Sequence, residues 1–259
     1  MENPEEDMAV EQKIKRWLTK SGRDIELQVA NAARDAGATA FQSVPYVDAE
    51  EHKERETDVV AQFDGQHGTD IPVFLVIECK RAHGKHWVTF PHEGWTISPQ
   101  PIENHALVDP GDYVRTAILE EDWSGGESIF APEPALSTGL VEADLSPTSS
   151  KRGDSNSLDT GTNALRQCWS AARGLLIPYG TGAFGELFPI IIPVIVTWAQ
   201  LWTCRLATDG SGVQVDQADY ARIRAPGMGH EVLIHVMGPG RFATFARQVS
   251  KLQARRQSS

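Results

Sequence analysis

Two carboxylates and a lysine occur at the ends of two short apolar segments in this sequence. Asp58 opens the first segment, and the apolar run 73–77 leads directly into Glu78, Cys79 and Lys80. Both segments are rich in β-branched and aromatic residues, with turn-forming residues between them, so they predict an antiparallel pair of strands. Folding about that turn brings Asp58 level with the end of the second strand. Because side chains alternate along a strand, Glu78 and Lys80 share one face and Cys79 points away.

Those residue types are suited to metal-assisted phosphoryl transfer. Mg²⁺ keeps several of its waters and binds through one or two protein carboxylates together with substrate phosphates. A lysine ammonium beside the carboxylates can position a water or stabilise charge that develops on phosphate oxygens. The competing interpretation is an exposed ion pair between Glu78 and Lys80, which would stabilise the protein by less than about 1 kcal/mol. The continuous apolar run before Glu78 is typical of a strand covered on both faces, where an unpaired charge is costly, and it favours the site.

The spacing of these residues resembles the PD-(D/E)XK, or restriction-endonuclease-like, nuclease superfamily. Asp58 is followed after nineteen residues by Glu78-Cys79-Lys80 on the paired strand. The resemblance covers residues 22–81 well and the later helix and strand more loosely.

Two further positions bear on the resemblance. Members of this superfamily commonly carry a glutamate on the helix before the first strand, and Glu26 is placed for that role. A glutamate near a helix N-terminus is also favoured by the helix dipole alone, so only the order of the elements supports a functional role for Glu26. Thr57 stands where the superfamily's name has proline, a position at which many members differ.

The resemblance implies a fold, an activity and a set of site residues. The implied fold is an α/β restriction-endonuclease-like core with a central mixed sheet flanked by helices. The implied reaction is hydrolysis of phosphodiester bonds with Mg²⁺, or Mn²⁺ in its place, on nucleic acid, with DNA favoured over RNA. The setting it suggests is prokaryotic restriction or phage defence. There the protein would act as an endonuclease, either as a homodimer or with a regulatory protein partner. Asp58, Glu78, Glu26 and the backbone carbonyl of Cys79 would hold the metal, and Lys80 would orient or activate the water.

The composition is that of one ordinary globular domain spanning residues 1–259. The cysteines are Cys79, Cys168 and Cys204; they are widely spaced and form no CxxC pair, which favours a reducing, cytoplasmic compartment and argues against structural zinc. The N-terminus is acidic and polar, so we expect no signal peptide. The most apolar segment, 187–206, is interrupted by proline, glutamine and arginine, so we expect a buried strand and no membrane span.

A net charge of −11 is unusual for a nucleic-acid enzyme. Ten acidic residues and one basic residue, Arg115, lie between Glu103 and Asp144, so this stretch carries −9 of the total. We predict that residues 88–160 form an acidic insertion after the third strand.

The elements that must position the site follow from periodicity and from turn residues. Gln167 is expected on the solvent-facing side of its helix. We expect helices over 8–20, 24–37, 162–176 and 241–257, strands over 38–47, 55–60, 73–80, 189–203 and 231–237, and turns over 48–54 and 209–212.

Two groups of cationic and aromatic residues are candidates for contact with nucleic acid. Cations beside an aromatic side chain suit a phosphate backbone and a stacked base. An ordinary exposed loop explains the first group as well, and a solvated helix face is the default explanation of the second. The first group, directly after the proposed site, is Arg81, Lys85 and Trp87. The second, at a four-residue spacing on the last helix, is Arg247, Lys251 and Arg255.

Two other functions remain open. The chain could be a catalytically silent or auxiliary module of the same fold that binds a protein partner through the acidic insertion, although the intact Asp58, Glu78 and Lys80 argue against it. It could also be a different phosphoryl-transfer enzyme, such as an RNA-specific nuclease or an effector gated by a partner.

Overall fold

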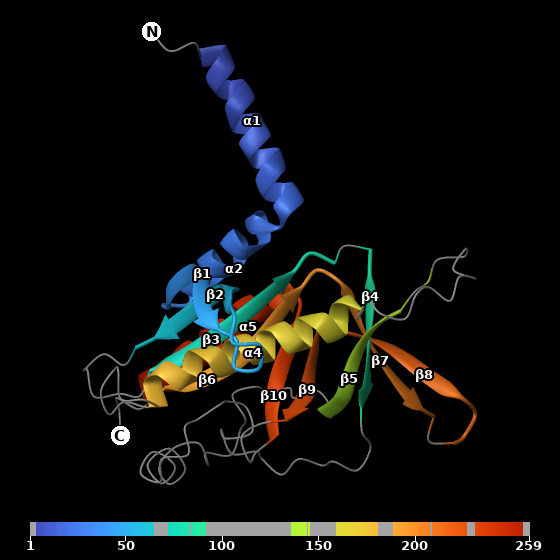
Figure 1. Cartoon of the computed structure of the whole chain (residues 1–259). Coiled ribbons are helices and arrows are strands. Elements are labelled where there is room, and N and C mark those ends of the chain that lie inside the picture. The colour runs from blue at the N-terminus through green and yellow to red at the C-terminus, as the bar shows by residue number, and fades with distance from the viewer. Residues whose placement is uncertain are drawn as a thin grey trace.

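A mixed β-sheet runs through the whole molecule, and helices cover both faces of one half of it (Figure 1). The structure is a computed structural model that describes residues 4–64, 72–82, 84–91, 136–143, 145, 159–180, 189–207, 209–226 and 231–255. The helices are α1 (Pro4–Ser21), α2 (Arg23–Asp35), α4 (Thr160–Gly180) and α5 (Pro239–Arg255). The strands are β1 (Thr39–Val47), β2 (Glu54–Phe63), β3 (Val73–Lys80), β4 (His86–Pro91), β5 (Leu136–Ala143), β6 (Ile190–Thr197), β7 (Gln200–Leu206), β8 (Val213–Ala218), β9 (Tyr220–Pro226) and β10 (Glu231–Met237). Their order across the sheet is β1-β2-β3-β6-β10-β9-β5-β4-β7-β8.

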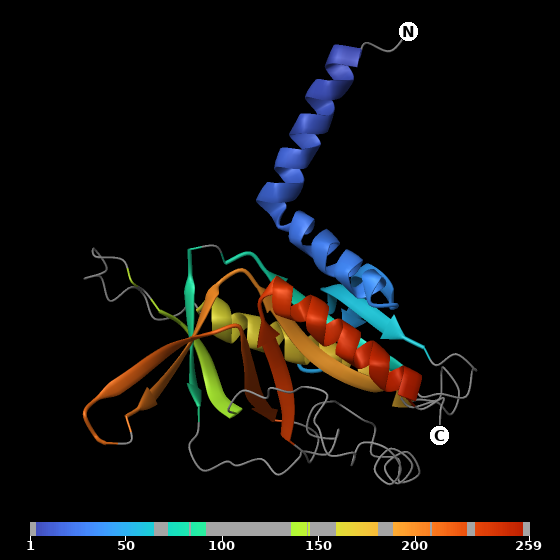
Figure 2. The ribbon, with the colours of Figure 1, turned by 180° about the vertical axis from the view of Figure 1, so that it is seen from behind.

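The half of the sheet from β1 to β10 carries the candidate catalytic residues. β2 pairs antiparallel with both β1 and β3, whereas β6 pairs parallel with both β3 and β10. Helices α2 and α5 pack on one face of this half, and α4 packs on the other (Figures 1 and 2). The prediction of an α/β protein with a mixed sheet flanked by helices is confirmed.

The apolar run of β3 explains why the sheet is covered on both faces. Val73, Leu75 and Ile77 are buried against the α2 and α5 side, and Phe74 and Val76 are buried against α4. Burial stabilises each such side chain by roughly 1.5–3 kcal/mol. This strand therefore lies in the centre of the domain, as a continuous apolar run predicts.

Helix α2 lies close to the sheet because its inward face includes small residues. Ala30 and Ala33 are fully buried beside Val29. The helix is bounded by Gly22, with φ of 85°, and is followed by Gly37, with φ of 95°. Left-handed backbone of this kind favours glycine. The helix expected over 24–37 is therefore present but spans Arg23–Asp35, with Ala36 as its C-cap before Gly37.

The second half of the sheet changes our interpretation of residues 88–160. Strands β4 and β5 pair with each other, and they pair in parallel with β7 and β9 respectively. The described part of this region thus supplies β5, most of β4 and the start of α4, and neither strand was predicted. The rest of the expected acidic insertion lies outside the described residues.

The predicted strand over 189–203 is in fact two strands, β6 and β7, separated by a corner. At that corner Trp198 N–H donates to the Lys80 carbonyl at 3.1 Å, and Ala199 N–H donates to Thr197 Oγ1 at 3.0 Å. The chain therefore turns away from β3 just beyond the candidate site. Strands β8 and β9 were not predicted. Within the described ranges, no helix is long and apolar enough to cross a membrane.

Candidate functional site

The candidate site forms where β2 and β3 separate at one end of the sheet. Their register last pairs Val59 with Ile77, one step before Asp58. Beyond that pair, side chains replace backbone partners. Thr57 Oγ1 donates to the Ile77 carbonyl at 3.4 Å, and the Cys79 N–H donates to Asp58 Oδ2 at 2.6 Å. The separation of the strands therefore holds the Asp58 carboxylate in one orientation at the end of the hairpin.

Glu78 and Lys80 lie together on the face of β3 that packs toward α4. The register and the alternation of the strand place Asp58 opposite Glu78. Lys80 Nζ donates to Glu78 Oε1 at 2.5 Å, and only 6% of Glu78 is exposed. An exposed ion pair, the competing interpretation of these residues, does not describe a carboxylate that is this deeply buried.

The electrostatics of the two carboxylates reflect their burial. Burial, with a further contribution from the charge of Asp58, raises the pKa of Glu78 to about 7, although Lys80 opposes the rise. Burial also raises the pKa of Asp58, against the Cys79 amide and the charges of Lys80 and Arg23. Perturbed carboxylates that influence one another in this way are typical of functional sites, although structural ion pairs can produce them too.

Glu26 reaches the same end of the sheet from the first turn of α2. Its side chain is 13% exposed and forms an ion pair with Arg23 at 3.3 Å. Arg23 also donates to Ser43 Oγ at 2.8 Å, which connects this helix to β1. Burial, then the charge of Asp58, raise the pKa of Glu26. The structure therefore brings Glu26 within electrostatic range of Asp58.

Cys79 contributes its backbone to the site. Its side chain packs against the apolar cluster on the α2 and α5 side, and burial raises the pKa of its thiol well above the usual value. The thiol is therefore protonated and is unsuited to metal binding at neutral pH. Any role of Cys79 as a ligand belongs to its carbonyl, as the resemblance implies.

The carboxylates of Asp58 and Glu78 are the donors that could hold a divalent cation. Within the part of the chain that the structure describes, no group of three or more His, Cys, Asp and Glu side chains is arranged to hold a metal ion. Mg²⁺ does not require three, because one or two carboxylates are its usual protein ligands. A cation would also offset the repulsion by which the charge of Asp58 raises the pKa of Glu78. The donor set therefore fits Mg²⁺.

The expectation that Trp87 stacks on a base is wrong. Its side chain has no exposed surface, and its Nε1 donates to Thr160 Oγ1 at 3.1 Å. The ring packs with Leu140 and Cys168 between β4 and α4. Trp87 is therefore a core residue. The prediction was wrong because an aromatic residue near cations in the sequence was taken to be exposed.

The two cations predicted beside Trp87 are engaged with carboxylates. Arg81 Nη2 pairs with Asp24 Oδ2 on α2 at 2.5 Å, and Lys85 pairs with Glu142 on β5. Arg81 lies directly after β3, so the structure places it at the rim of the candidate site. Contact of either residue with phosphate stays a prediction.

The cations of α5 lie away from the candidate site. Arg247 and Lys251 are exposed on α5, which covers the opposite face of the sheet from α4 (Figure 2). The side chain of Arg255 lies outside the described residues. The structure therefore does not combine this row with Asp58 and Glu78 in one surface.

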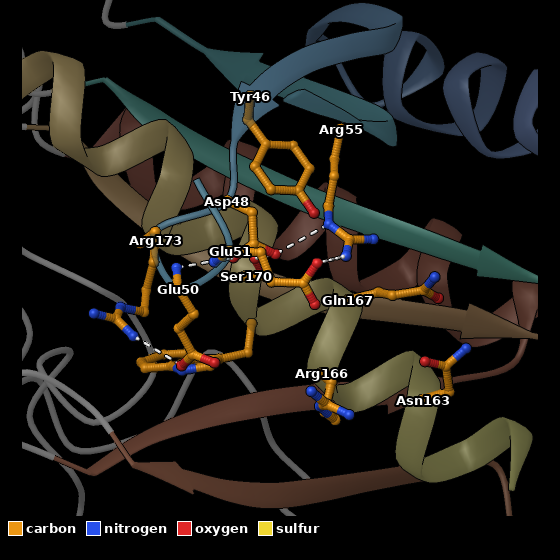
Figure 3. A pocket seen from close by; sticks show the side chains of 12 residues that line it. Tyr46, Asp48, Glu50, Glu51, Arg55, Asn163, Arg166, Gln167, Ser170 and Arg173 are labelled. Atoms are coloured by element: carbon orange, nitrogen blue, oxygen red, sulfur yellow. Dashed lines mark hydrogen bonds and ion pairs between the residues drawn. The ribbon is translucent and has the colours of Figure 1, made fainter. Parts of the chain in front are cut away.

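A polar pocket between the β1–β2 turn and α4 was not predicted (Figure 3). Asp48, expected only as part of a charged turn, is 6% exposed and accepts hydrogen bonds from the backbone N–H groups of Glu50 and Glu51, both at 2.9 Å. It also accepts one from Ser170 Oγ on α4 at 2.7 Å and pairs with Arg55 Nε at 3.1 Å. An aspartate at the start of a turn is the sequence signal for the first two bonds. The bond to α4 could not be read from the sequence.

Gln167 also lies differently from our expectation. It lines this pocket, its side chain is partly buried, and its Oε1 is buried. On α4 it is four residues before the buried Ala171 and three after the buried Ala164, so it borders the inward stripe. The expectation of a solvent-facing Gln167 is therefore wrong.

Comparisons of the chain with protein-family models, with curated proteins and with solved structures found no match. The resemblance to nucleases accordingly depends on the residues and the geometry described above.

Proposed function

We propose that the protein is a Mg²⁺-dependent phosphodiesterase that hydrolyses nucleic acid, with DNA the favoured substrate. The observation that carries this proposal is the buried Glu78 beside the half-buried Asp58 where β2 and β3 separate, with Lys80 bonded to Glu78 at 2.5 Å. A structural role alone leaves the burial of Glu78 beside a second carboxylate unexplained, because a charge costs free energy when it is removed from water and more so next to a like charge.

The arrangement of elements supports the same proposal. The chain runs α2, β1, β2, β3 and then, after β4 and β5, α4 and β6, with β3 and β6 parallel; this order supports the core that the resemblance implies. The carboxylates lie at the carboxyl end of β3, beside the corner that joins β6 to β7. In open α/β sheets, this is the edge at which ligands bind.

Each site residue has a role that follows from its contacts. Asp58, oriented by the Cys79 N–H, and Glu78 would hold Mg²⁺, with Glu26 adding charge from α2. When bound, the ion would supply a water of lowered pKa and would offset negative charge on the scissile phosphate. Lys80, held by Glu78, points its ammonium to this site, where it would orient the attacking water and donate to a phosphate oxygen.

The test is cleavage by the purified protein and by Asp58→Asn. Supercoiled plasmid, linear duplex DNA, single-stranded DNA and RNA would each be incubated with Mg²⁺, with Mn²⁺ and with EDTA. We expect cleavage that needs the metal and that the variant lacks. Calorimetric titration of Mn²⁺ into both proteins would show binding that Asp58→Asn weakens.

Two results would contradict the proposal. One is cleavage by Asp58→Asn at the rate of the unaltered protein. The other is a folded protein that neither cleaves any substrate nor binds the metal, which would favour a catalytically silent module.

A further inference from the structure

The pocket in Figure 3 lies beside the candidate site, on the same face of the sheet. Tyr46 from β1 lines it, and the charge of Glu78 contributes to the raised pKa of Tyr46. On the α4 side, Cys168, which follows the pocket residue Gln167, lies with its Sγ 3.4 Å from the Val194 carbonyl on β6. The pocket residue Arg55 precedes Asp58 by three residues on β2, so the pocket lies at the end of the hairpin that carries the candidate site.

The wall formed by the β1–β2 turn has its carboxylates already paired. Asp48 accepts the backbone and side-chain bonds described above. Glu51 Oε2 pairs with Arg55 Nη2 at 2.9 Å, and Glu50 Oε1 pairs with Arg173 Nη1 at 3.4 Å. The carboxylates of this wall are thus hydrogen-bonded or ion-paired within the protein, so they offer little negative charge to a ligand.

The wall formed by α4 carries polar side chains that are not paired within the described part of the chain. Asn163, Arg166 and Gln167 line the pocket over one turn of α4. None of these three side chains has a hydrogen bond or an ion pair with any residue that the structure describes, and Gln167 Oε1 is buried without a partner. A buried carbonyl oxygen without a partner is costly, so a group that supplies a donor is expected there.

The chemistry of this row indicates its ligand. An amide side chain presents a donor and an acceptor side by side, which matches the edge of a nucleobase, and a guanidinium matches a phosphate. The cavity, of about 240 Å³, is smaller than the roughly 300–1,000 Å³ of pockets for drug-sized ligands, so it suits a group the size of one nucleotide.

We propose that this pocket binds one nucleotide of the substrate strand, with Arg166 on its phosphate and Gln167 and Asn163 on its base edge. The proposal rests on the nuclease function. It adds that the pocket recognises one base beside the cleaved bond. It also predicts that Gln167 lowers the stability of the folded protein when no nucleotide is bound.

The experiment measures binding in EDTA, where cleavage does not occur. The four nucleoside 5′-monophosphates, inorganic phosphate and short single-stranded oligonucleotides would be titrated into the full chain and into Gln167→Leu and Arg166→Ala. The matched controls are Gln28→Leu and Arg16→Ala, at exposed helical positions of α2 and α1.

We expect Gln167→Leu to weaken nucleotide and oligonucleotide binding about tenfold or more, to reduce the preference among bases, and to melt at an equal or higher temperature than the unaltered protein. Arg166→Ala should weaken the binding of all four nucleotides to a similar degree. Both controls should bind as the unaltered protein does. A merely structural Gln167 would give a lower melting temperature with unchanged binding.

Failure of this proposal can be told from failure of the proposed function. If the protein cleaves nucleic acid and both pocket variants bind and cut with unchanged base preference, the pocket assignment is wrong. Binding of inorganic phosphate with equal affinity, and no effect of Gln167→Leu on any base, would likewise overturn it. If the pocket variants alter nucleotide binding but no substrate is cleaved with Mg²⁺, the pocket stands and the nuclease function fails.

Discussion

Glu78 is a carboxyl whose surroundings oppose its charge. Burial and the neighbouring Asp58 raise its pKa to about 7, and Lys80 compensates only in part. In the metal-free protein, its proton is therefore bound more tightly in the folded state than in the unfolded state. The consequences can be measured as stability against pH and as cleavage rate.

The first prediction concerns Glu78→Gln and the free energy of unfolding. A pKa raised from 4.5 to about 7 contributes stability that is fully present below pH 4.5 and is lost as pH rises through 7. We expect the unaltered, metal-free protein to lose up to about 3 kcal/mol relative to Glu78→Gln between these pH values. Urea unfolding at several pH values checks this, with the exposed Glu54→Gln as the control. If the free energy of unfolding changed with pH to the same extent in the unaltered protein and in Glu78→Gln, the assigned burial of Glu78 would be contradicted.

The second prediction concerns Lys80→Met and the cleavage rate. Because the ammonium is placed to act in the transition state, we expect kcat to fall roughly 10²- to 10⁴-fold with Mg²⁺ at saturation. Lys13→Met, at an exposed position on α1, should leave the rate unchanged. Cleavage by Lys80→Met at the unaltered rate would remove Lys80 from the mechanism while leaving the metal site open to test.

At the scale of elements, β1 changes the face it presents to the helices. Ala38 and Ala40 pack on the α2 and α5 side, whereas Val44 and Tyr46, at positions of the same parity, pack toward α4. Ser43, with φ of 51°, lies at the change. A non-glycine residue in the left-handed region is uncommon, and here it occurs beside the site, opposite Asp58 in the register of β1 and β2. This change of face turns Tyr46 toward α4, where it lines the pocket.

The third prediction concerns Asp48, which fixes the β1–β2 turn to α4. Hydrogen bonds from the turn backbone and from Ser170, outweighing burial, lower the pKa of Asp48 to about 2. Asp48→Ala should therefore lower the free energy of unfolding by about 2–4 kcal/mol, since it leaves several donors without their acceptor. Ser170→Ala should cost about 1 kcal/mol. Denaturant unfolding at pH 7 measures both, and equal effects would contradict a central role for the carboxylate.

The same carboxylate predicts a direction with pH. Its folded pKa lies below the ordinary 3.8, so its contribution is present above pH 3.8 and is lost as pH falls through 2. The stability difference between the unaltered protein and Asp48→Ala should therefore shrink in that range.

The fourth prediction concerns Gly174, where α4 meets β1. A Cβ built there would lie 2.5 Å from Tyr46 Cδ2 and 2.6 Å from the Val47 carbonyl oxygen. Because one of these atoms belongs to the backbone, Gly174→Ala should destabilise the fold by about 1–3 kcal/mol. Gly240→Ala in α5, with no atom within 4 Å of the new Cβ, should be neutral or stabilising. Thermal melting of both variants tests the close approach of α4 to the hairpin.

At the scale of the whole molecule, α1 projects away from the sheet and meets the rest of the protein through α2 (Figures 1 and 2). Its apolar positions Val10, Ile14 and Trp17 are 50%, 51% and 57% exposed. The stripe that predicted this helix therefore faces solvent in the single chain and adds little to the domain core.

The fifth prediction follows from that exposure. Removal of residues 1–20 should change the free energy of unfolding by less than about 1 kcal/mol, because few buried apolar contacts are lost. Thermal and urea unfolding of the shortened chain would check it. A large loss of stability would mean that α1 packs on the domain in solution.

Sequence alone determined the local features of this protein. The position of the turns, the central strands β2 and β3, the helices and the shared face of Glu78 and Lys80 all follow from the period of apolar residues and from glycine and proline, which act over short distances along the chain. The position of Asp58 level with the end of β3 followed too, because the turn and the apolar pattern set the register of a hairpin.

Tertiary structure decided what depends on contacts between distant segments. Trp87 could be assigned to the core only once β4 and α4 were in contact, and β4 and β5 could be placed in the sheet only through their partners β7 and β9. The burial of Glu78 and the unpartnered Gln167 Oε1 likewise arise from packing between elements far apart in sequence. Residue types show which groups can do chemistry, whereas desolvation and partnership, which set the pKa of those groups, exist only after the chain has folded.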